Sequence, residues 1–160
     1  MIKVTKFKDI DPKMNLLSPN GRAAMLGWAG VDYLKACMFV QENHEQLGPL
    51  FAFRLPTMHQ TLELFSKAVA SSADNSFDSN KYKHHVLMLI QDYSGKVPIF
   101  ASILSYPDAT KLFEGLEKSY LGVRYGECAH SHDGDAWLLF LKIANDLLDD
   151  LTSRTKIRFF

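Results

Sequence analysis

The sequence has few of the features that would place it outside the class of single-domain globular proteins. Among 160 residues it has two cysteines, Cys37 and Cys128, which excludes a disulfide framework and a four-cysteine zinc site. Its longest apolar run is about five or six residues, far below the roughly 20 that a membrane-spanning helix needs. The first residues contain no signal-peptide core. We therefore expect one cytoplasmic domain without membrane association.

Neither sign of charge dominates. The 18 basic residues balance 18 acidic ones, and 47% of the chain is apolar. This balance argues against a protein that coats nucleic acid broadly, so any nucleic-acid contact must be local. The chain also lacks a P-loop, a G-x-G-x-x-G loop and a G-x-S-x-G elbow, which excludes the common nucleotide-binding and serine-hydrolase motifs.

The periodicity of apolar residues is helical through most of the chain. Apolar side chains recur at steps of three and four residues, the spacing of one helix face. The predicted helices span about 22–43, 57–71, 84–93, 108–126 and 134–152. A strand is the alternative for the third of these segments. The fold class predicted is all-α: an antiparallel up-and-down bundle of four to five helices.

Three regions follow from this pattern. We expect a short polar N-terminal arm over 1–21, the helical bundle over 22–152, and a basic C-terminal tail over 153–160. Pro56 should either kink the second helix or start it, because proline removes a backbone donor.

A polar row accompanies the second helix. His59, Glu63 and Lys67 are spaced by four, so they stack on one flank of that helix. One interpretation is an ordinary ion pair on a partly exposed face. The other is a ligand-binding site, which needs further polar groups nearby.

A cationic cluster, Lys81-Tyr82-Lys83-His84-His85, could supply those groups. It stands at the predicted start of the short helix, where the helix dipole does not favour cations. Lys83 and His85 are therefore candidate contacts to a bound anion or to a neighbouring acid. The alternative is that His85 is only a packed, backbone-bonded residue.

A second cluster lies near the predicted end of the fourth helix and includes Arg124, Tyr125 and His130. Arginine can grip a phosphate with two hydrogen bonds, and histidine can move a proton near neutral pH. On one continuous helix, residues six apart point about 240° from each other, so Arg124 and His130 would not share a face. They converge only if the helix breaks near Gly126 or if two chains build the site.

Metal binding is the other chemistry that this cluster offers. Its imidazoles and carboxylates follow the pattern H-x-H-D-x-D from His130 to Asp135, which matches no specific zinc motif. We therefore predict no metal and no cofactor.

The order of these elements resembles the HEPN family, named for its occurrence in higher eukaryotes and prokaryotes. The resemblance covers about 22–152. It depends on five short motifs in order, namely Asp32-Tyr33-Leu34-Lys35-Ala36, the E-x-x-x-K-A-like Glu63-Leu64-Phe65-Ser66-Lys67-Ala68, the H-x-L-like His85-Val86-Leu87, the segment from Leu116 to Tyr125, and the last helix.

The resemblance implies a helical bundle, often a homodimer, that is associated with RNA or nucleotides. Many members cleave RNA in toxin and defence systems, some beside a nucleotidyltransferase-type partner. Catalytic members carry R-x(4-6)-H, and Arg124 and His130 meet that spacing. These two are the candidate catalytic residues of a metal-independent endoribonuclease. His59, Glu63, Lys67, Lys83, His85 and Tyr125 are the candidate ligand-binding residues.

Two other functions are compatible with the same residues. In catalytic members Asn, Asp or His often follows the arginine, whereas Tyr125 stands here. The second interpretation is a non-catalytic module that binds a nucleotide or a protein. A dimerisation domain built on Trp137, Leu141 and Leu148 is the third interpretation.

Overall fold

The computed structural model describes residues 18–48, 53–124 and 134–159, and these residues form helices without any β-strand. The prediction of an all-α chain is therefore confirmed. The long helices are α1 (Pro19–Glu42), α3 (Arg54–Ala73), α7 (Ala109–Arg124) and α8 (Gly134–Thr155). The short ones are α2 (His44–Leu47), α4 (Ser79–Tyr82), α5 (Val86–Tyr93) and α6 (Pro98–Leu104).

Helix α1 begins three residues before the predicted start. The Ser18 hydroxyl accepts a hydrogen bond of 3.0 Å from the Gly21 N–H, and Pro19 occupies the first helical position. Serine followed by proline is a favoured helix start, because serine satisfies a free N–H and proline lacks one. Residues 19–21, which we assigned to the arm, are thus part of the first helix.

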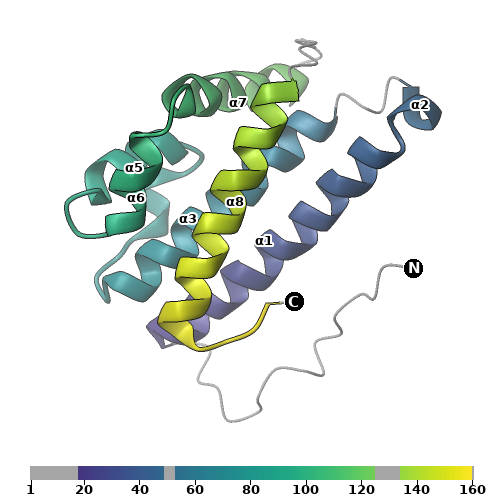
Figure 1. Ribbon diagram of the computed structural model, residues 1–160. Helices are drawn as coiled ribbons and strands as arrows, with labels where there is room; N and C mark the ends of the chain where they lie inside the picture. Colours follow the sequence, from purple (N-terminus) through teal and green to yellow (C-terminus); the bar gives the residue numbers. More distant parts are fainter. Residues whose placement is uncertain (1–17, 49–52, 125–133, 160) are drawn as a thin grey trace.

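Helices α1, α3 and α8 lie side by side (Figure 1). Arg54 at the start of α3 donates a hydrogen bond to Gln41 near the end of α1, and Gly27 in the first half of α1 lies against Leu151 near the end of α8. Helix α1 therefore runs antiparallel to both partners. Arg54 and Trp137 bring the first turns of α3 and α8 together, so these two helices run in the same direction.

Glycine allows the close approach of α1 to its neighbours. A Cβ atom added at Gly30 would lie 2.6 Å from the Phe65 ring, and one at Gly27 would lie 2.4 Å from the Phe159 ring. Both rings are buried, so neither can move aside without cost.

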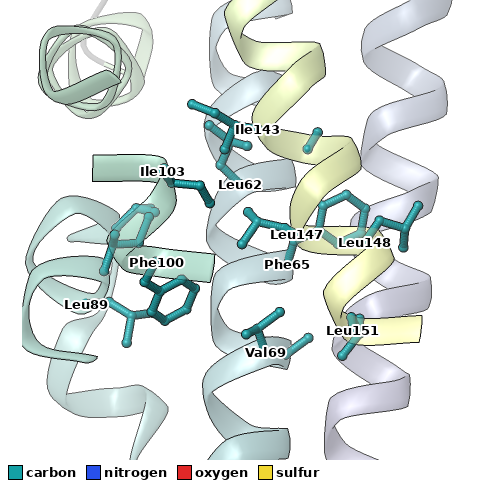
Figure 2. Close-up of a cluster of buried hydrophobic side chains, with 14 of the residues drawn as sticks. Leu62, Phe65, Val69, Leu89, Phe100, Ile103, Ile143, Leu147, Leu148 and Leu151 are labelled. Carbon is teal, nitrogen blue, oxygen red and sulfur yellow. The ribbon is translucent and has the colours of Figure 1, made fainter. Parts of the chain in front are cut away.

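The core fills the space between α3, α8 and the α5–α6 pair. Figure 2 shows Phe65 and Val69 of α3 beside Leu147 of α8, with Leu89 and Phe100 completing the cluster. Burial of such side chains is the main driving force for folding. The prediction that Cys37 is a core residue is also met: it is fully buried, and burial raises the pKa of its thiol to about 11.

Helix α1 is the one described helix that is long and apolar enough to cross a membrane by length and composition, a test that core helices also pass. Eight of its residues are buried in this fold. Four of its large apolar side chains, Met25, Tyr33, Met38 and Phe39, are exposed.

The C-terminal residues pack onto the bundle. Helix α8 continues to Thr155, beyond the predicted start of the tail at 153, and Phe159 is buried. Its ring centroid lies 5.9 Å from that of Trp28 in α1. The end of the described chain is thus held by an aromatic contact.

Candidate functional site

A buried carboxylate, Glu63 of α3, is the centre of the candidate site. It is 5% exposed and accepts hydrogen bonds on both oxygens. Oε1 lies 2.6 Å from the Lys67 Nζ, and Oε2 lies 2.9 Å from the His84 Nδ1. The i,i+4 pair that the sequence predicted is therefore present, and His84 makes it part of a larger group. We call Glu63, Lys67, His59, His84 and Tyr120 the Glu63 cluster.

The cluster fastens the turn between α4 and α5 onto α3. The Lys67 Nζ donates to the Lys83 carbonyl at 2.5 Å, and the His59 Nε2 donates to the His84 carbonyl at 3.0 Å. Lys83 has a φ of 45°, in the left-handed region that is costly for a side chain with Cβ. These two hydrogen bonds hold the turn in that conformation.

His59 is almost completely buried and has a defined tautomer. Because its Nε2 donates to a carbonyl, the Nδ1 of the neutral ring carries no proton. This Nδ1 is buried without a hydrogen-bond partner among the described residues and lies 3.8 Å from the Glu63 Oε2. Burial lowers the pKa of His59, and the nearby Glu63 carboxylate only partly opposes this. The imidazole is therefore held neutral beside a carboxylate.

Tyr120 of α7 closes the cluster. Its ring stacks on His59 with centroids 4.6 Å apart and planes at 23°, and it lies 4.9 Å from the His84 ring. Aromatic stacking adds stability beyond area burial and fixes ring orientation. Helix α7 is thus oriented by contacts with both α3 and the α4–α5 turn.

His85 lies outside the cluster, on the other side of the turn. Its Nδ1 is 3.7 Å from the Glu117 Oε2, and the other oxygen of Glu117 accepts from the Leu87 N–H at 3.0 Å. Glu117 therefore caps the start of α5 from a different helix, which a carboxylate at a helix N-terminus does well. His84, and not His85, is the imidazole that reaches Glu63.

The structure describes the remaining predicted residues to different extents. Lys83 contributes its carbonyl, while its side chain is exposed. Tyr125 and His130 lie outside the described residues, as does Cys128. Arg124 is the last residue of α7, four positions after Tyr120, and its side chain is not among those described.

Sequence reasoning did not assign Tyr120 and Glu117 to the site. Both lie in the segment from Leu116 to Tyr125 that carries part of the resemblance, but a tyrosine on the apolar stripe of a helix is normally a core residue, and Glu117 is at a variable position of that motif. Their roles depend on how α7 crosses α3 and α5, which no local pattern indicates.

Within the described residues, no group of three or more His, Cys, Asp or Glu side chains has an arrangement that could hold a metal ion. His132 and Asp133 lie outside them. Comparison with family models, with curated proteins and with solved structures found no match for this chain.

Proposed function

We propose that this chain is an HEPN-type domain that acts on RNA or nucleotides, with Arg124 and His130 as the residues of a metal-independent endoribonuclease. The observation that carries the proposal is the Glu63 cluster. It joins the E-x-x-x-K-A-like segment of α3 to Tyr120, one helical turn before Arg124. The polar row thus supports the helix end that bears the R-x(4-6)-H arginine.

The reaction would be a transesterification in which the ribose 2′-oxygen attacks the adjacent phosphorus atom. His130 removes the 2′-hydroxyl proton or protonates the departing 5′-oxygen, and the P–O5′ bond breaks as the new P–O2′ bond forms. Arg124 stabilises the negative charge that develops on the phosphoryl oxygens. The products are a 2′,3′-cyclic phosphate and a free 5′-hydroxyl.

A composite site in a homodimer would bring Arg124 and His130 together where one straight helix would not. In this proposal the Glu63 cluster positions α7, and it takes no part in proton transfer. A nucleotidyltransferase-type protein is the partner that the resemblance suggests.

Cleavage of labelled mixed-sequence RNA in EDTA tests the proposal. We expect wild-type protein to cleave, and Arg124→Ala and His130→Ala to lose about 100-fold or more in rate. Arg158→Ala and His44→Ala, at exposed positions of the chain, are the matched controls and should cleave at the wild-type rate. Circular dichroism verifies that every variant is folded.

The rival function is that of a module that binds a nucleotide without cleaving it. Tyr125 favours this function, because catalytic members often have Asn, Asp or His after the arginine. It would be supported by a folded wild-type protein that leaves RNA intact yet binds it. Equal cleavage by all five proteins would indicate a contaminating nuclease and would remove the proposed activity.

A further inference from the structure

A cavity of about 420 Å³ lies between the first turns of α3 and α8 and the middle of α7. This volume is within the range of small-molecule sites. It is distinct from the Glu63 cluster: Met58 lines it and the neighbouring His59 does not, and Ser119 lines it while Tyr120 faces the imidazoles. Helix α7 therefore separates two sites, one on each flank.

The walls suit a flat ring. Trp137 lines the cavity; the Arg54 guanidinium lies over its indole, 5.8 Å from the centroid, and the Phe140 ring packs 5.3 Å from it. Leucine side chains from α3 and α7, including Leu112 and Leu116, supply the apolar surface. Indole faces and aliphatic side chains favour planar aromatic ligands by stacking and by apolar burial.

The charges of the cavity balance. Among the described residues that line it, Arg54 and Lys111 are basic, whereas Asp108 and Asp135 are acidic. Such a site gives no net attraction to a polyphosphate, but it offers both donors and acceptors to the edge of an uncharged ring. Ser119 adds a hydroxyl that can serve as either.

Gly115 lines this cavity from an exposed position on α7. It stands inside α7, where glycine destabilises a helix relative to alanine. Unlike Gly27 and Gly30, it is not required by packing, because a Cβ added there would meet no atom within 4 Å. Its φ is also not in the left-handed region. Neither packing nor backbone conformation therefore requires glycine here, and a bulky side chain can be placed at the rim of the cavity without a clash.

We propose that the cavity binds one uncharged, nitrogen-containing aromatic ring of the nucleobase class, in contact with Trp137. This inference rests on the proposed function and deepens it, because the helix that lines the cavity at Ser119 ends at Arg124. The ring is either that of a free nucleoside or nucleotide, or a base within an RNA strand. In the second case the cavity selects the base beside the cleaved phosphodiester.

The test is a titration of the full chain with the four common nucleosides, their 5′-monophosphates, short homopolymeric RNAs, and ribose 5-phosphate. The chain has two tryptophans, so Trp28→Phe leaves Trp137 as the fluorescent reporter. In that background Gly115→Leu adds a bulky side chain at the rim of the cavity, and Gly115→Ala, which adds one carbon there, is the matched control. Both should fold, because the position has room and both residues favour helix over glycine.

We expect at least one nucleoside to bind and its monophosphate to bind within about threefold, since the cavity carries no net charge. Gly115→Leu should weaken binding at least tenfold and Gly115→Ala less than threefold, with ribose 5-phosphate not binding. Binding of homopolymeric RNA without free nucleosides, lost in Gly115→Leu, assigns the site to a base within RNA. Equal binding by Gly115→Leu, or no binding by any of these probes, overturns the inference.

Failure of this inference and failure of the proposed function give different results. If cleavage depends on Arg124 and His130 while Gly115→Leu changes neither binding nor cleavage, the cavity assignment is wrong and the nuclease stands. If nucleosides bind in a Gly115-dependent way and RNA stays intact, the cavity assignment stands and the nuclease is wrong.

Discussion

At the scale of single residues, His59 is an imidazole whose protonation opposes folding. Burial holds its pKa below the ordinary value of 6.5, and the weaker attraction of Glu63 and Glu117 does not restore it. In the unfolded chain the ring takes up a proton at the ordinary value. The stability due to the neutral buried ring is therefore complete above pH 6.5 and decreases as the pH falls toward the folded-state pKa.

We expect the free energy of unfolding to fall by up to about 1.4 kcal/mol for each pH unit in that window. His59→Gln keeps a donor for the His84 carbonyl and removes the titration, so its stability should depend less on pH. Urea unfolding on either side of pH 6.5 measures this. His44→Gln, a substitution on exposed α2, is the control, and equal pH slopes for wild type and His59→Gln would contradict the assignment.

The sequence showed the spacing of His59, Glu63 and Lys67 but not their depth. An i,i+4 row can face solvent or a packed neighbour, and the difference depends on where the rest of the chain lies. Tyr120 covers His59 from a helix 61 positions further along the chain, and the α4–α5 turn covers Glu63. Burial converted an ordinary surface pattern into a connected polar group.

At the scale of elements, Glu63 fastens the α4–α5 turn to α3. Glu63→Ala leaves the Lys67 ammonium and the His84 imidazole without their carboxylate in a site where Glu63 and Lys67 side chains are 6% and 12% exposed. Removing one partner of a buried ion pair is costly, so we expect a loss of about 3 kcal/mol in unfolding free energy.

The matched control is Asp150→Ala in α8. It removes an i,i+4 pair with Arg154 whose side chains are 23% and 26% exposed, and such pairs contribute less than about 1 kcal/mol. Chemical denaturation of both variants compares the two costs. If they destabilise equally, Glu63 does not fasten the turn.

Comparison of predicted and observed helix starts shows where local sequence signals were sufficient to place a helix boundary. Pro56 falls in the first turn of α3, so of the two roles that the sequence offered it, starting the helix is the one seen. The predicted start of the short helix at residue 84 was two residues early, because His84 turns toward Glu63 and Glu117 caps α5 from outside. Contacts between elements moved that boundary.

At the scale of the whole molecule, Phe159 joins the end of the described chain to α1. Its ring is buried against Gly27 and Trp28, so Phe159→Ala should leave a cavity and cost about 3 kcal/mol in unfolding free energy. Phe53→Ala, at a ring that is 51% exposed, should cost less than about 0.5 kcal/mol. Thermal unfolding distinguishes them, and an unchanged midpoint for Phe159→Ala would show that the tail is not part of the folded unit.

The sequence by itself determined the helical class and the approximate extent of each long helix. Apolar residues at steps of three and four can be buried together only when the backbone is helical, and this holds whatever the neighbours are. Ser18-Pro19 likewise specifies a helix start from local hydrogen bonding alone.

Only the tertiary structure decided which polar residues meet. The same-direction pairing of α3 and α8, the choice of His84 over His85 and the cavity beside Gly115 all depend on how helices cross. The angles and positions at which helices cross are determined by side-chain packing over the whole core. That packing is a sum of many small contacts between residues far apart in the chain. No local pattern contains that sum, so the site became visible only once the helices were packed.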